Sequence, residues 1–315
     1  MSEEEPHDHQ RIRMEFVRIS ADERKRECVL RQRFANFWGT ASGEPRAIYD
    51  TFISASPLTH DVVLWAIHER NVRGWWVRPQ HAEPGRAILF LHGGGYVQGS
   101  ARAYRGFVSQ IVSRARIPAV VIDYPLAPEA TVPAAPEAAM AAWQWLVAQG
   151  FDRLAVVGDS AGGGLTLVTL AELIKKPHGA APIAGVVFSP WTDLAFTGAS
   201  MKDPADADPL IGYDYLQDCA RKYLGAADSH DPLASPLFGD LRGLPPLLIQ
   251  VGTDERLLDD AKQYADRARQ AGVSVDLEIF EGMHHVFQLD VAHLESSRVA
   301  LDRAARFLRN VFDGR

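Results

Sequence analysis

Short apolar runs that alternate with helix-like segments constrain the fold of this chain more than any other feature. Six runs rich in Val, Ile and Leu lie at 86–92, 117–124, 153–158, 183–190, 245–252 and 273–280. Continuous runs of this kind are typical of strands buried on both faces of a parallel sheet. Segments between them, such as 137–150 and 259–272, have the character of helices. The alternation predicts an α/β protein whose mostly parallel sheet is flanked by helices.

Two further segments extend the predicted sheet. Residues 61–70 and 71–79 have the character of adjacent strands, which brings the expected number to about eight. The main domain is therefore expected to comprise residues 60–190 and 226–315.

Two other segments lie outside this sheet. Residues 1–59 are expected to contain a polar tail, up to about residue 19, and two helices near 22–38 and 46–54. Residues 191–225 are rich in Pro and Asp and contain one short helical piece. An insertion that does not continue the sheet is more often a cap over a site than a second domain.

Composition excludes some classes of partner. The 315 residues include 33 basic and 40 acidic ones, which gives a net charge of −7. No basic block could follow a phosphate backbone, so we expect no nucleic acid partner. Cys28 and Cys219 are not spaced as a metal site or a redox pair would require. Residues 1–10 are acidic and polar, unlike a secretory signal. No apolar run approaches the roughly 20 residues that span a membrane. These features favour a cytoplasmic protein, and they leave open whether it forms a homodimer.

A serine between a strand and a helix is the first candidate for chemistry. The sequence GDSAGGG, residues 158–164, follows an apolar strand and precedes a helical segment. GxSxG in this context is typical of a nucleophile elbow, whose small residues permit a tight turn that raises the serine hydroxyl above the sheet. Ser160 is therefore the predicted nucleophile, and a chance Gly/Ser turn is the alternative.

A glycine run supplies the complementary feature. His92 to Gly95 read HGGG directly after the run at 86–91. Attack on an ester carbonyl creates an oxyanion, which backbone N–H groups can stabilise when they converge on one point. Gly94 and Gly95 let the backbone approach closely, and Ala161, the residue after the serine, would add a third donor. Phosphate binding is disfavoured because neither GxxxxGK[ST] nor GxGxxG accompanies the run.

A general base and an acid are expected after the last two strands. GMHHVF, residues 282–287, offers His284 and His285, and QVGTDERLLDD offers Asp254 and Glu255. The order serine, acid, histidine is typical of such hydrolases. Either type of acid can hold the imidazole in its productive tautomer, so these residues alone leave both pairs of candidates open.

Together these motifs resemble those of the hormone-sensitive lipase-like esterases, the bacterial family IV, which have the α/β-hydrolase fold. HGGG, YPLAPE at 124–129, GDSAGGG and the GxxHxF pattern of Gly282, His285 and Phe287 carry the resemblance from about residue 60 to the C-terminus. It implies that His285 is the base and that Glu255 occupies the acid position of DxLxD.

The resemblance also implies features that support the site. Glu129 would be a structural partner near the oxyanion loop, the N-terminal helices and residues 191–225 would form the cap, and Gly164 replaces the usual Asn. Apart from the resemblance, we expect five aromatic residues of these segments to line the pocket or, alternatively, to pack within the cap: Phe34, Phe37, Trp38, Tyr213 and Tyr215.

The implied activity is that of a serine carboxylesterase acting on short- to medium-chain esters through an acyl-enzyme, with no metal or cofactor. The form of the acid motif also resembles a branch that includes lactone hydrolases. Deacetylation and non-catalytic ligand binding are the remaining alternatives.

Overall fold

A nine-stranded sheet forms the centre of the molecule. The computed structural model describes residues 13–202 and 208–315, and its strand order is β1-β9-β8-β7-β6-β4-β5-β3-β2. The strands are β1 (Arg13–Val17), β2 (Val62–His68), β3 (Arg73–Pro79), β4 (Arg86–Leu91), β5 (Ala119–Ile122), β6 (Arg153–Asp159), β7 (Pro182–Phe188), β8 (Leu247–Gly252) and β9 (Val275–Phe280). Only β2 with β3 and β3 with β5 pair antiparallel among these strands. The predicted α/β-hydrolase architecture and all eight predicted strands are confirmed.

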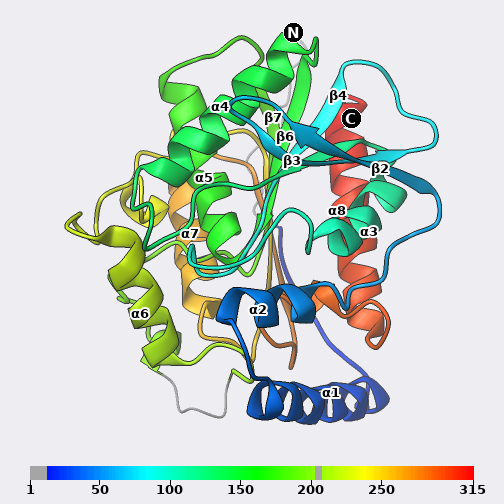
Figure 1. Cartoon of the computed structure of the whole chain (residues 1–315), viewed down its shortest axis with the longest axis vertical. Helices are drawn as coiled ribbons and strands as arrows, with labels where there is room; N and C mark the ends of the chain where they lie inside the picture. Colours follow the sequence, from blue (N-terminus) through cyan, green and yellow to red (C-terminus); the bar gives the residue numbers. More distant parts are fainter. Residues whose placement is uncertain (1–12, 203–207) are drawn as a thin grey trace, which may run out of the picture.

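Helices cover both faces of this sheet (Figure 1). Those in the described residues are α1 (Ala21–Thr40), α2 (Pro45–Ile53), α3 (Arg105–Ala115), α4 (Ala134–Ala148), α5 (Ser160–Lys175), α6 (Tyr213–Leu224), α7 (Leu258–Gln270) and α8 (Glu295–Phe312). Helices α4, α5 and α7 lie on one face, and α3 and α8 lie on the other. Helices α1, α2 and α6 lie toward one end of the molecule, away from α4 and the upper ends of the sheet strands.

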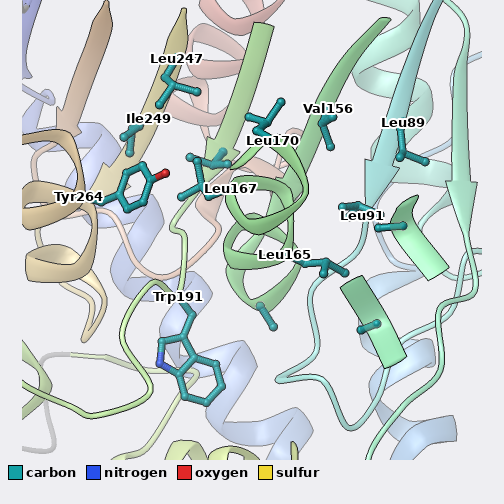
Figure 2. Close-up of a cluster of buried hydrophobic side chains, with 14 of the residues drawn as sticks. Leu89, Leu91, Val156, Leu165, Leu167, Leu170, Trp191, Leu247, Ile249 and Tyr264 are labelled. Atoms are coloured by element: carbon teal, nitrogen blue, oxygen red, sulfur yellow. The ribbon is translucent and has the colours of Figure 1, made fainter. Parts of the chain in front are cut away.

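Each face of the sheet buries its own apolar cluster. Figure 2 shows leucines of α5 beside strand residues on the face that α4, α5 and α7 cover: Leu89, Val156, Leu165, Leu167, Leu170, Leu247 and Ile249. The opposite cluster joins α3 and α8 to strand residues such as Phe90 and Phe188. Because both faces are covered, the central strands carry continuous apolar sequences rather than alternating ones.

The ninth strand corrects the prediction for the N-terminal tail. Residues 1–12 of that tail lie outside the described residues, but β1 pairs parallel with β9, where Met14 lies opposite Leu277 and Phe16 opposite Ile279. Met14 and Phe16 are exposed while Glu15 and Val17 are partly buried, so this five-residue edge strand has only weak hydrophobic periodicity.

The structure also contains two helices without a sequence prediction, α3 and α8. Both predicted N-terminal helices form, as α1 and α2, and the side chain of Ser20 caps α1 by accepting a hydrogen bond from the backbone N–H of Glu23. The helical piece predicted near residues 211–225 is α6.

Candidate active site

The turn from β6 into α5 presents Ser160. The strand ends at Asp159 and the helix begins at Ser160, whose φ is 53°. Positive φ is unfavourable for a residue with a side chain, and strain of this kind is characteristic of the nucleophile elbow. Ser160 is only 8% exposed, but it lines a cavity above the elbow.

A histidine and a glutamate from separate loops complete a hydrogen-bonded row with this serine. His285 Nε2 lies 2.9 Å from Ser160 Oγ, and His285 Nδ1 lies 2.8 Å from Glu255 Oε2. The carboxylate can only accept, so Nδ1 must carry a proton. In the neutral ring, Nε2 is then free to accept the proton of the serine hydroxyl.

The two neighbouring carboxylates point to different partners. Glu255 is buried, and its Oε1 accepts hydrogen bonds from Ser189 Oγ and from the N–H of Gly252, at 3.0 and 2.8 Å. Asp254 Oδ2 instead contacts Arg24 and Arg31 of α1, at 3.2 and 2.8 Å. Of the two acids considered from the sequence, only Glu255 reaches the His285 ring.

The environment of His285 favours its charged form. Burial by itself lowers the pKa of His285, but the hydrogen bond and negative charge of Glu255, with further negative charge from Asp208 and Asp159, outweigh it and raise the pKa. The site therefore stabilises the imidazolium that forms when the ring takes a proton.

The glycine loop lies beside this row. Gly94 and Gly95 line the same cavity as Ser160 and His285. Gly94 has φ 115°, and a Cβ there would overlap with the carbonyl of Gln98, so a side chain would displace the loop. Ala161 is in the first turn of α5, where N–H groups have no intrahelical acceptor. The three predicted oxyanion donors therefore come from the loop beside Ser160 and from the turn that follows it.

Asp159 supports this loop, a role that sequence reasoning missed. Its Oδ1 accepts from the N–H of Gly93 at 3.0 Å, and its Oδ2 accepts from Tyr104 Oη at 2.9 Å. Burial raises the pKa of Asp159 to about 7, although both hydrogen bonds lower it. A charged residue directly before the elbow serine was the available signal.

Glu129 contacts the glycine loop indirectly. It pairs with Arg46 of α2 at 2.6 Å, and Arg46 also donates to the carbonyl of Val97 at 2.8 Å. The expected structural partner is thus an exposed carboxylate that orients an arginine.

The cavity over Ser160 has a volume of about 430 Å³. Its walls come from α1, α2, α6 and the loop between β9 and α8, residues 281–294, which carries His285 and is called the base loop below. They include Trp38, Tyr49, Phe52, Leu210, Tyr215 and Leu289. Of the aromatics considered from the sequence, Trp38 and Tyr215 line it, and Phe34 and Phe37 line an adjoining cavity of about 320 Å³. Tyr213 packs against Phe196 instead, with ring centroids 5.6 Å apart.

Two further properties concern the described residues, 13–202 and 208–315. No three His, Cys, Asp or Glu side chains there are grouped to hold a metal ion. Within the same ranges, every helix is too short or too polar to cross a membrane.

Known proteins resemble this chain in sequence and in fold. A family model described as alpha/beta hydrolase fold matches residues 88–289. An acetyl-hydrolase of Streptomyces hygroscopicus is 40% identical over 236 residues, 74% of this chain and 78% of that protein. An esterase of Acinetobacter venetianus is 34% identical over 265 residues, 83% of this chain and 87% of that protein. The crystal structure of an esterase from the bacterial hormone-sensitive lipase family has a TM-score of 0.85 and 38% identity, covering 93% of this chain and 99% of that chain.

The fold and the family match define the class as α/β hydrolases. This chain belongs to the bacterial hormone-sensitive lipase family of that fold, as its motifs predicted, and it is a carboxylic ester hydrolase acting on small-molecule esters.

Proposed function

We propose that Ser160, His285 and Glu255 form the catalytic triad of this esterase. The observation that carries the proposal is the unbroken row from Ser160 Oγ through the His285 ring to Glu255, with distances of 2.9 and 2.8 Å. In this mechanism Ser160 Oγ attacks the ester carbonyl carbon while its proton passes to His285 Nε2. Glu255 stabilises the resulting imidazolium.

Collapse of the tetrahedral intermediate breaks the bond to the leaving oxygen. His285 gives its proton to that oxygen, the alcohol departs, and the acyl group remains on Ser160. Water then repeats the sequence, losing a proton to His285 and releasing the carboxylic acid and the free serine. The N–H groups of Gly94, Gly95 and Ala161 would stabilise the oxyanion at both stages.

The substrates we propose are esters with short to medium acyl chains. Helices α1 and α2 and residues 191–225 would act as a cap, and residues 203–207 of that segment lie outside the described structure. A cavity of about 430 Å³ can bury only a limited tail. We expect kcat/KM to be higher on acetate to hexanoate esters than on esters of long fatty acids. Equal or better values on long-chain emulsions would contradict this, and a parallel panel of lactones tests the alternative suggested by the acid motif.

The serine is tested by replacing it. Ser160→Ala should remain folded and lose essentially all turnover, because the covalent intermediate cannot form. Rapid mixing with p-nitrophenyl acetate should give a burst of p-nitrophenol in the native protein and none in the variant. Ser113→Ala is a matched control, since that hydroxyl bonds to Asp61 away from the cavity, at 2.9 Å. Near-normal hydrolysis by Ser160→Ala would refute the assignment, and binding without any burst would favour a ligand-binding role.

We further propose a cytoplasmic location. Cys28 and Cys219 are both free, which suits a reducing compartment. Cell fractionation tests the location, and light scattering in solution tests whether the protein forms a homodimer.

A further inference from the structure

Helix α1 carries a buried carboxylate that the esterase mechanism does not use. Glu27 is completely buried, and its Oε1 accepts a hydrogen bond from Arg31 Nε at 2.6 Å. The same oxygen lies 3.2 Å from Nδ1 of His284, the neighbour of His285 in the base loop. A buried carboxylate without compensation would destabilise the fold, so this contact is energetically significant.

His284 is enclosed between two acids. Its second ring nitrogen, Nε2, lies 3.0 Å from Oδ2 of Asp290, and the side chain itself has no exposure. Carboxylates accept and cannot donate when ionised, so both ring nitrogens must carry protons to satisfy the two contacts. Burial by itself lowers the pKa of His284, but Asp290 and Glu27 outweigh it and raise the pKa to about 9. The ring is therefore an imidazolium at neutral pH.

A second set of contacts joins the same helix to the loop between β8 and α7, residues 253–257, which carries Glu255 and is called the acid loop. Arg24 and Arg31 both contact Asp254, the residue before Glu255, and Arg24 also donates to the carbonyl of Gly282 at 3.3 Å. Helix α1 is thus tied to the segments that present Glu255 and His285. Three acids and three bases make up the set, so its formal charge is balanced: Glu27, Asp254, Asp290, Arg24, Arg31 and His284.

The base loop needs this support because its backbone is strained. Val286, directly after His285, has φ 51°, a conformation unfavourable for a β-branched residue. Strained conformations persist only where surrounding contacts hold them. The N–H of Val286 bonds to Ser189 Oγ at 3.0 Å on one side of the loop, and the His284 contacts hold the other side.

We propose that the six charged residues form a clasp through which α1 positions the acid and base loops, with the imidazolium of His284 at its buried centre. The proposal rests on the catalytic roles proposed for Glu255 and His285. Residues of the clasp touch neither substrate nor reacting atoms, so they are positioning residues. Helix α1 would then have two functions, since Trp38 near its end also lines the cavity.

The pH dependence of turnover distinguishes positioning from general stability. Loss of the His284 proton would leave one ring nitrogen facing a carboxylate without a hydrogen bond, and the clasp would loosen. We expect kcat of the native protein to fall on the alkaline side as His284 loses its proton. In Glu27→Gln one of the two stabilising charges is gone, so this fall should move toward neutral pH.

Glu23→Gln is the matched control. Glu23 is a buried carboxylate one turn earlier on the same helix, and it pairs with Arg26 and accepts from the N–H of Ser296 in α8. It has no contact with the base loop among the hydrogen bonds of the described residues. Its removal should leave the alkaline fall of kcat where the native protein has it, even if the protein becomes less stable.

The assay is hydrolysis of p-nitrophenyl acetate from pH 6 to 10, corrected for spontaneous hydrolysis. Glu27→Gln should lower kcat at neutral pH by about tenfold, in line with a small misplacement of catalytic groups, while KM changes little. If Glu27→Gln does not fold, Asp290→Asn tests the other ring nitrogen with a side chain that is 17% exposed. An unshifted alkaline fall in whichever variant folds would refute the clasp, as would an equal shift in Glu23→Gln.

A fluorophosphonate reagent separates this proposal from the assignment of the triad. Each clasp variant should still become labelled at Ser160, only more slowly, with one label per chain at completion. Rapid turnover by Ser160→Ala would instead show that the assumed triad is wrong.

Discussion

Glu255 performs two tasks with its two carboxylate oxygens. One accepts from His285 Nδ1, and the other is held by Ser189 and by the N–H of Gly252. In Glu255→Gln, the oxygen can keep the Ser189 and Gly252 contacts, but an NH₂ group then faces His285 Nδ1. The ring must turn its lone pair to that group and put its proton on Nε2, which prevents it from accepting from Ser160.

We therefore predict that Glu255→Gln lowers kcat on the order of 10²-fold or more, since an amide in place of a triad aspartate in another fold costs about 10⁴-fold. Asp254→Asn should cost much less, because that residue contacts α1 and not the ring. Steady-state kinetics on a short acyl ester measures both variants. A nearly inactive Asp254→Asn beside an active Glu255→Gln would mean that the acid lies one residue earlier.

Motif register was sufficient to predict the three residues of the hydrogen-bonded row, Ser160, Glu255 and His285, but not the residues that support them. Ser160, Glu255 and His285 stand in local patterns that can be read from a few neighbouring letters. The α1 residues that contact Asp254 and His284 lie more than 220 residues away in the sequence. Such ion pairs depend on tertiary packing, which leaves no local pattern in the sequence.

At the scale of elements, burial decides which strands and helices could be predicted. Central strands such as β6 and β7 are buried on both faces and carry unbroken apolar runs, so their sequences indicate strands directly. Edge strand β1 buries little, and its five residues could not be distinguished from a polar tail. The register of β1 against β9 depends on backbone pairing rather than on side-chain pattern.

Gly164, which replaces the usual family residue, reflects close packing of α5. A Cβ at this position would overlap with the carbonyl oxygen of Trp191, and the N–H of Trp191 bonds to the carbonyl of Ser160 at 2.9 Å. A side chain at Gly164 would therefore push the segment that follows β7 away from the elbow. We predict that Gly164→Ala, and more strongly Gly164→Asn, lowers the free energy of unfolding by about 1–3 kcal/mol or more through overpacking.

Gly39 provides the opposite case within another helix. It lies near the end of α1, and no atom is within 4 Å of its added Cβ. Gly39→Ala should raise the free energy of unfolding by up to about 1 kcal/mol, because alanine is the better helix former. Urea unfolding followed by circular dichroism measures both variants. A stabilising Gly164→Ala would show that the Trp191 segment moves freely and that α5 is not tightly packed there.

For the molecule as a whole, buried ionisable groups link stability to pH. Asp159, Glu27 and His284 are all buried near the site. Asp159 has its pKa raised to about 7 by burial, so its contribution to stability is complete below its unfolded pKa and is lost as the pH rises through 7. The neutral range is thus not the range of greatest stability for this group.

His284 extends this loss of stability to higher pH. Its pKa is about 9 in the folded protein against an unfolded value near 6.5, because Asp290 and Glu27 outweigh the opposing effect of burial. Because the pKa is higher in the folded protein, the contribution of protonated His284 to the free energy of unfolding is complete below pH 6.5 and disappears as the pH rises through about 9. The shift corresponds to a loss of stability on the order of 3 kcal/mol.

We predict that the free energy of unfolding, measured by urea titration at several pH values from 6.5 to 9, falls across this range in the native protein. The decline should be smaller in the double variant Glu27→Gln, His284→Gln, which removes both charges and leaves neither unpaired with the other. A native protein whose stability is constant over this range, or a double variant with the same decline, would show that His284 does not carry a proton between the two acids.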